Sequence, residues 1–172
     1  MFEQPSYLGV GTAGWVAALK SSDPLERRLA AHALAEIGGA AREAVPALTE
    51  ALRDPVSFVR VWAAAALARV QPENAYAIPT LLAGTRDRAY FVRSLAAWHL
   101  GRLGPQHPGI EAVMPELREL LNDDDPSVHA EALVALGNLA GKGAPPAELK
   151  SLSATLSSRD ASHPASRRLR GP

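Results

Sequence analysis

Apolar and polar positions along this chain follow the period of an amphipathic helix, and the pattern is clearest over residues 56–70. One helical face of this segment is wholly apolar and consists of Val59, Ala63, Ala66, Leu67 and Val70. The opposite face also lacks charge and consists of Val61, Ala65 and Ala68. The spacing therefore predicts a helix that buries one face in a core and leaves a second apolar face to be explained.

The same pattern recurs four times in register. The blocks Arg27–Leu34, Arg60–Leu67, Arg93–Leu100 and His129–Leu136 begin 33, 33 and 36 residues apart. A second block, centred on Pro46, Pro79 and Pro115, keeps the same steps of 33 and 36. Each unit therefore predicts two helices joined by a turn, with the extra residues of the last step in the loop at 104–109.

Helix-end signals agree with this periodicity. Asp23 is a predicted N-cap, with Pro24 at the first helical position and Glu26 placed for a capping box, and Asp125-Pro126 repeats that opening. Glycines suit the helix C-termini, where a left-handed residue ends the coil; they are Gly38, Gly39, Gly104 and Gly141. The predicted helices cover residues 11–21, 24–37, 42–53, 56–70, 76–85, 88–103, 110–122, 126–140 and 145–157. The last of these is a closing helix.

Charge and composition narrow the class of protein. Lysine plus arginine and aspartate plus glutamate each number 18, which disfavours nucleic acid as a partner because a phosphate backbone attracts an excess of positive charge. The chain has no cysteine, so disulfides, thiolate catalysis and cysteine metal sites are excluded. The start resembles no signal peptide and no stretch has the length of a membrane span, so we expect a soluble, cytoplasmic protein without membrane contact.

Two segments carry a family resemblance. Asp54–Arg60 reads Asp-Pro-Val-Ser-Phe-Val-Arg, Asp125–Val128 repeats its opening, and each is followed by an alanine-rich run that ends in leucine. Residues 11–140 thereby resemble HEAT repeats of the short bacterial kind also seen in phycobilin lyases. The resemblance implies an all-α fold, a right-handed α-solenoid (superhelix) of four HEAT-like helical hairpins plus the C-terminal closing helix. We expect residues 1–157 to form this solenoid and residues 158–172 to form a flexible basic tail.

The second helix of each unit resembles the concave wall of such solenoids. The wall carries few charges, so we predict that a protein partner covers it. Its predicted partner-binding residues are Arg28, His32, Val61, Ala65, Ser94, Trp98, Ala130 and Val134. Trp98 has two interpretations: an anchor for a partner segment, or a ring folded onto its own or a neighbouring repeat.

Other conspicuous residues are interpreted as scaffold. Trp62 lies beside the apolar stripe and predicts packing between repeats, and Trp15 predicts a core position. A column of arginines predicts ion pairs with acidic turn residues of neighbouring units. The arginines are Arg27, Arg60 and Arg93, and the acidic residues are Asp54, Asp87 and Asp124.

No catalytic or metal-binding constellation, and no cofactor motif, is visible in the sequence. No histidine is followed by glutamate, as in the HEAT-like deoxyhypusine hydroxylases, and each histidine predicts a surface or satisfied structural role. Trp98 has no carboxylate one turn away, which disfavours a HEAT-like DNA glycosylase. The glycines of Gly9–Gly14 open a predicted helix without a preceding strand, so they predict no phosphate loop.

These observations predict a non-catalytic scaffold or adaptor for protein–protein interaction. One alternative is a lyase-like or chaperone-like holder of a flat apolar ligand such as a tetrapyrrole, stacked on Trp98. A weaker one is nucleic-acid binding through the tail residues Arg167, Arg168 and Arg170. Self-association through an open solenoid end near Trp15 and Leu19 is compatible with all three of these functions.

Overall fold

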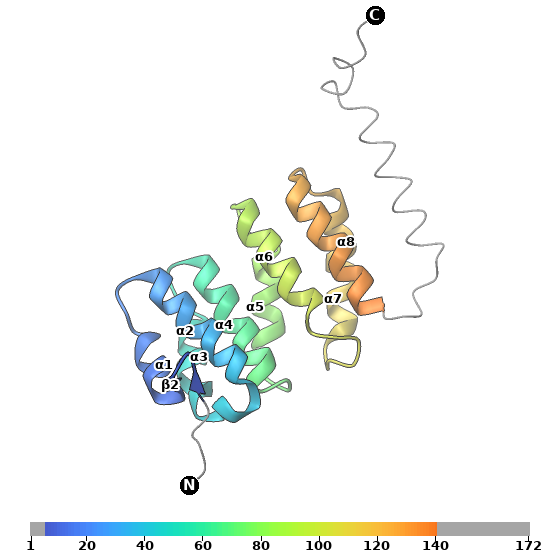
Figure 1. The fold of residues 1–172 in the computed structure, drawn as a ribbon. Coiled ribbons are helices and arrows are strands. Elements are labelled where there is room, and N and C mark those ends of the chain that lie inside the picture. The colour runs from blue at the N-terminus through green and yellow to red at the C-terminus, as the bar shows by residue number, and fades with distance from the viewer. Residues whose placement is uncertain (1–5, 141–172) are drawn as a thin grey trace, which may run out of the picture. The chain divides into compact units, whose positions relative to one another are not determined.

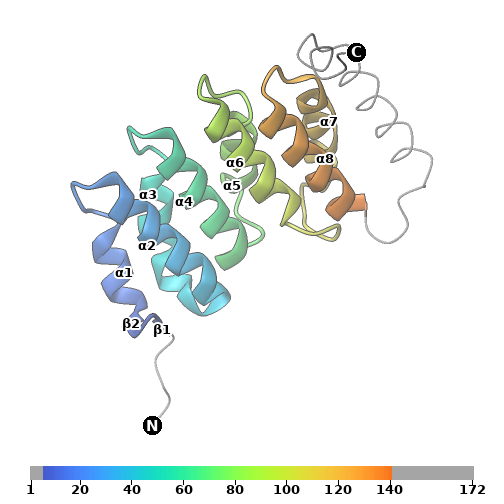
Figure 2. The ribbon, with the colours of Figure 1, turned by 45° about the horizontal axis from the view of Figure 1, so that its top comes forward.

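The computed structural model describes residues 6–140, which form two layers of helices (Figures 1 and 2). The helices are α1 (Thr12–Ala18), α2 (Pro24–Ile37), α3 (Val45–Ala51), α4 (Ser57–Val70), α5 (Ala77–Gly84), α6 (Tyr90–Gly101), α7 (Ile110–Glu119) and α8 (Pro126–Ala140). Short 3-10 segments precede α3 (Gly38–Ala44) and follow α7 (Leu120–Asn122). Helices α2, α4, α6 and α8 follow one another in one layer, and α1, α3, α5 and α7 form the other. We call α1/α2, α3/α4, α5/α6 and α7/α8 the first to fourth helix pairs.

The predicted helices are confirmed from the first to the eighth. Helix α2 covers the predicted 24–37, and α8 covers the predicted 126–140. The helices of the other layer are shorter than predicted. Before α3, Ala41 has non-helical dihedrals and residues 38–44 form a 3-10 helix, and a second 3-10 segment replaces the end of the predicted helix 110–122. The predicted closing helix (145–157) and tail (158–172) lie outside the described residues.

A short antiparallel hairpin precedes α1, and the sequence interpretation missed it. Strand β1 (Ser6–Tyr7) pairs with β2 (Val10–Gly11) through a turn in which Leu8 and Gly9 both have positive φ. The interpretation that the glycines open a helix without a preceding strand is therefore wrong. Two-residue strands are too short to show a period of two, which is why hydrophobic alternation gave no signal.

The apolar stripe predicted for residues 56–70 is confirmed as core. Its five residues are all buried in α4, which packs against α2, α3, α5 and α6. Alanine and glycine bring these helices close together. A Cβ added at Gly101 of α6 would lie 2.5 Å from the Cα of Ala135 in α8. Small residues in this layer therefore set the spacing of its helices.

Helix ends follow the predicted signals with two differences. The Asp23 carboxylate accepts from the Leu25 amide at 2.9 Å, and the Asp125 carboxylate accepts from the Ser127 amide at the same distance. Gly38 and Gly104 have the predicted positive φ, Gly39 does not, and Gly141 lies outside the described residues. Glu26 does not close the predicted capping box on the Asp23 amide. Instead it accepts from the Ser21 hydroxyl, whose oxygen accepts from the Asp23 amide.

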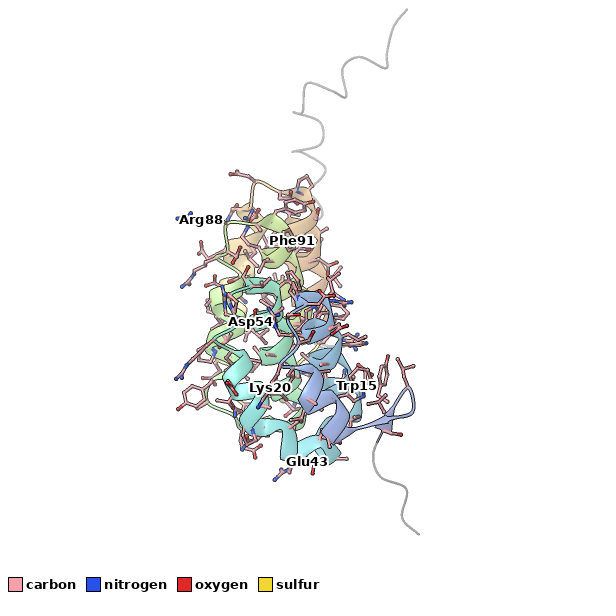
Figure 3. The ribbon with its side chains drawn as sticks, turned by 90° about the vertical axis from the view of Figure 1, so that its left-hand side faces the viewer. Trp15, Lys20, Glu43, Asp54, Arg88 and Phe91 are labelled. Carbon is pink, nitrogen blue, oxygen red and sulfur yellow. The ribbon has the colours of Figure 1, made fainter. Side chains whose placement is uncertain are left out.

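Two arginine–aspartate pairs join successive helix pairs. Arg27 donates from Nε and Nη2 to both oxygens of Asp54 at 2.6 and 2.9 Å, as predicted. Arg93 makes the equivalent pair at 2.7 Å twice, with Asp123 rather than the predicted Asp124. The predicted pair of Arg60 with Asp87 is not formed. Asp54, labelled in Figure 3, follows α3, and Asp123 follows α7.

Both paired aspartates have lowered pKa values. Burial alone would raise the pKa of Asp54, but hydrogen bonds from Arg27 and from the Val56 amide hold that pKa below its usual value. The hydrogen bond from Arg93 is the largest cause of the lowered pKa of Asp123. A lowered pKa contributes stability that is present above the unfolded-state pKa, near 4, and is lost as the pH falls through the folded-state pKa.

Replacing Asp54 tests this contribution. We expect Asp54→Asn to lower the free energy of unfolding at pH 7 by about 2 kcal/mol, because Arg27 loses a charged acceptor. The matched control is Asp87→Asn, which we expect to stay within about 0.5 kcal/mol, since Asp87 caps the Ala89 amide without pairing with Arg60. Urea denaturation at pH 7 and pH 4 measures both, and the Asp54 variant should lose less stability on acidification. Equal effects of the two substitutions would contradict this account.

Candidate functional site

The predicted wall residues lie on α2, α4, α6 and α8, in one layer of helices (Figure 2). The half-buried members are Arg28, His32, Ser94 and Trp98. The exposed members are Ala130 and Val134, and 55% of Val134 is exposed. The structure thus places six of the eight predicted residues where a partner could touch them.

The other two predicted wall residues are buried. Val61 is only 1% exposed and belongs to the core, so its assignment to an accessible surface was wrong. The physical reason is that α4 also packs on α5: a Cβ added at Gly84 would lie 2.7 Å from Cγ2 of Val61. Ala65 is 4% exposed, also against the prediction, although it contributes to the floor of a small pocket.

A cluster of aromatic rings crosses from the first to the third helix pair. Trp62 of α4 contacts three rings, with centroid distances of 5.1 Å to His32, 6.2 Å to Trp98 and 4.5 Å to His99. Tyr7 of the hairpin extends the cluster, with its ring 5.7 Å from His32. The predicted packing role of Trp62 between repeats is confirmed. The predicted core position of Trp15 is also confirmed, and its indole donates to the Tyr7 carbonyl at 3.3 Å.

Cationic side chains cover these rings. The Arg28 guanidinium carbon lies 5.7 Å from the Trp62 ring centroid, and that of Arg102 lies 4.7 Å from the Trp98 centroid. Arg69 pairs with Glu36 at 3.1 Å beside them. All of these side chains except Arg28 line a pocket of about 70 Å³, the tryptophan pocket. It is lined by His32, Ala35, Glu36, Trp62, Ala65, Ala68, Arg69, Trp98, His99, Arg102, Leu103 and His107.

His99 is the residue of this pocket that sequence reasoning missed. It is 8% exposed, and among the described residues its Nε2 has no hydrogen-bond partner, so its predicted role as a surface or satisfied histidine was wrong. Burial lowers the pKa of His99 to about 3, and the positive charges of Arg102 and Arg69 add to the shift. The imidazole is therefore neutral at pH 7. The available signal was its position between Trp98 and the core residue Leu100.

The described residues define a helical-repeat protein, since successive helix pairs bury their apolar faces against one another. Comparison with protein families agrees. The family model for HEAT repeats matches residues 12–93 and 78–165, and the chain belongs to the HEAT repeat family. The resemblance to its phycobilin lyase-like members stays a prediction. HEAT repeats generally mediate interactions between proteins.

The solved structures that are similar to this chain include the crystal structure of an engineered protein, at 28% identity and a TM-score of 0.49. The match covers 76% of this chain, and the chain spans 62% of that engineered protein. No curated protein matches the chain. Within residues 6–140, no helix combines the length and apolar character that crossing a membrane requires.

Proposed function

We propose that this protein is a non-catalytic scaffold or adaptor that binds a segment of a partner protein on the layer formed by α2, α4, α6 and α8. The binding surface comprises Arg28, His32, Ser94, Trp98, Ala130 and Val134. In this proposal the four helix pairs form a right-handed superhelix, residues 1–157 make up the solenoid with its closing helix, and residues 158–172 are the tail. Self-association through the first helix pair stays a prediction.

One observation carries the proposal: neighbouring side chains fix the position of the Trp98 ring, but the ring is not fully buried. Trp62 and His99 pack against its ring, and Arg102 stacks on it, so the indole has few conformations to lose on binding. Tryptophan and arginine are the residue types that dominate binding energy at protein interfaces. Val134, exposed on the next helix of the layer, extends the apolar surface. A partner segment seated here would gain apolar contact without reordering the scaffold.

Two substitutions test this surface. We expect Trp98→Ala and Val134→Glu each to weaken capture of an identified partner by at least about tenfold, because each removes apolar contact and Val134→Glu also places a charge there. The far-ultraviolet helix signal should stay unchanged. Ala112→Glu is the matched control, since it places the same charge on an exposed residue of α7, in the other layer of helices. Capture that all three variants retain equally would remove this surface from consideration.

The alternative of a tetrapyrrole holder finds less support. Pockets for ligands of that size have volumes of about 300 Å³ or more, whereas the tryptophan pocket beside Trp98 has about 70 Å³. The rings that line it already pack against one another. We therefore favour a protein segment over a flat cofactor as the occupant of this surface.

A further inference from the structure

The three repeated arginines have the same local geometry. Each donates from Nη1 to two backbone carbonyls of the turn that precedes its helix. These bonds run from Arg27 to Ser21 and Ser22 (2.9 and 3.1 Å), from Arg60 to Asp54 and Pro55 (2.8 and 3.2 Å), and from Arg93 to Asp87 and Arg88 (3.0 and 3.3 Å). All three guanidinium groups are therefore anchored in the same way at the start of α2, α4 and α6.

The remaining edge of the guanidinium distinguishes Arg60 from the other two. Nε and Nη2 of Arg27 and of Arg93 bind both oxygens of a carboxylate in the next helix pair. Within residues 6–140, the same edge of Arg60 has no carboxylate partner. The residue that corresponds to Asp54 is Asp87, which uses Oδ1 to cap the Ala89 amide at 2.9 Å and does not reach Arg60.

A cavity lies where the third pair would be. It has a volume of about 500 Å³, is lined by both Arg60 and Asp87, and opens between α3, α5 and the start of α4. Leu52 and Pro79 contribute apolar wall, and Tyr76, which is 62% exposed, stands at its edge. We call it the Arg60 pocket. It combines an anchored guanidinium edge with apolar walls and room for a small organic group.

The charge of the Arg60 pocket favours an anion. Its lining has two cationic side chains, Arg53 and Arg60, and one anionic side chain, Asp87. The nearby Asp54 carboxylate is already bound by Arg27. One added carboxylate would therefore neutralise the lining, and it would meet Arg60 with the bidentate geometry that guanidinium groups prefer.

We propose that the Arg60 pocket is a binding site for a carboxylate carried by an apolar group, the chemistry found at the C-terminus of a peptide and in small arylalkyl carboxylic acids. The carboxylate pairs with Nε and Nη2 of Arg60, in the place that Asp54 and Asp123 take beside Arg27 and Arg93. The apolar group lies against the walls formed by Leu52 and Pro79. This proposal is independent of the binding surface around Trp98, because the two use different residues.

Nuclear magnetic resonance of the arginine Nε–H groups tests the proposal in the full chain. The probe is N-acetylphenylalanine, and its uncharged amide is the control. We expect the Arg60 signal, assigned by its loss in Arg60→Gln, to shift saturably with the acid and not with the amide. The signals of Arg27 and Arg93 serve as internal controls and should stay in place, because their edges are already occupied.

Two variants sharpen the test. Arg60→Gln should weaken binding by about tenfold or more, since a charge-assisted pair is lost. Asp87→Asn should tighten binding severalfold, because it removes a like charge while its side-chain oxygen still caps Ala89. Helix content and thermal midpoint measured on each variant separate lost binding from lost folding. Asp87→Asn retains Arg60, so it tests the site even if Arg60→Gln fails to fold.

Each result has a definite meaning. Equal responses to N-acetylphenylalanine and 3-phenylpropionate would support the site and identify its ligand as any such acid, whereas a response to N-acetylphenylalanine alone would identify a peptide terminus. If the Arg60 signal matches those of Arg27 and Arg93 in the free protein and responds to neither acid, Arg60 and Asp87 are paired in solution and the proposal is wrong. A response to the amide equal to that of the acid would also overturn it.

Discussion

Between pH 7 and pH 5 the free energy of unfolding should fall by about 2 kcal/mol because of His99 alone. The folded protein keeps this imidazole neutral, with a pKa of about 3, because it is buried among Trp62 and Trp98 and faces the charges of Arg102 and Arg69. The unfolded chain takes up a proton near the ordinary value of 6.5. As the pH falls through 6.5 only the unfolded state gains the proton, so stability is lost progressively down to about pH 3.

The variant His99→Phe should remove this slope. A phenyl ring keeps the contacts with both tryptophans, and it replaces a buried Nε2 that has no hydrogen-bond partner. We therefore expect the variant to match or exceed the parent in stability at pH 7 and to be the more stable protein at pH 5. Urea denaturation at half-unit pH intervals measures the slope, in a range above that in which Asp54 and Asp123 titrate.

A matched control removes a histidine that lies outside the tryptophan pocket instead. His129→Gln replaces the side chain whose Nδ1 lies 2.6 Å from the Leu121 carbonyl, in the first turn of α8. We expect the pH slope to persist in this variant. A slope that survives in His99→Phe would mean that another group produces it, and the account of the buried imidazole would be wrong.

The fold was predictable from local signals because each helix carries its own. Asp23 and Pro24 start α2, Gly38 ends it, and the repeat positions the other helices by simple offset. Signals of this kind act within a few residues and survive in any tertiary context. The β1–β2 hairpin was not predictable in the same way, since two residues per strand carry no measurable alternation.

The candidate site was predictable only for residues whose exposure follows from their position on a single helix. Helical period alone separated Trp98 from the core stripe, and the structure leaves that ring half-buried. Val61 was misassigned because its burial depends on Gly84 of another helix pair, and a helical wheel does not describe neighbours. His99 was missed for the same reason, since its environment is built by Trp62, which lies 37 residues earlier in the chain.

Arg60, which forms no ion pair within residues 6–140, also could not be distinguished from the other two arginines by its sequence. Arg27, Arg60 and Arg93 are equivalent by sequence, and each is followed by an acidic turn one repeat later. Two of the three form ion pairs, and the third faces a cavity. The repeated residues alone therefore do not decide which of these pairs forms.

Packing between helix pairs is tested most directly by the substitution Gly101→Ala. A methyl group at this position would lie 2.5 Å from the Cα and 2.6 Å from the Cβ of Ala135, so α6 and α8 would have to separate. We expect a loss of about 2 to 3 kcal/mol in the free energy of unfolding, as for other overpacked cores. This loss exceeds the gain of about 1 kcal/mol that alanine brings to a helix in place of glycine.

The same substitution at Gly137 should have the opposite sign. Gly137 lies within α8, and nothing approaches within 4 Å of the position that its Cβ would take. Gly137→Ala should therefore stabilise the protein by about 0.5 to 1 kcal/mol through helix propensity alone. Urea denaturation of the two variants separates the two effects. Helix propensity alone predicts that both substitutions stabilise the protein, whereas the close approach of Ala135 to Gly101 predicts that only Gly137→Ala does so. If Gly101→Ala also stabilises the protein, α6 and α8 do not meet at Ala135, and the third and fourth helix pairs are not packed as described.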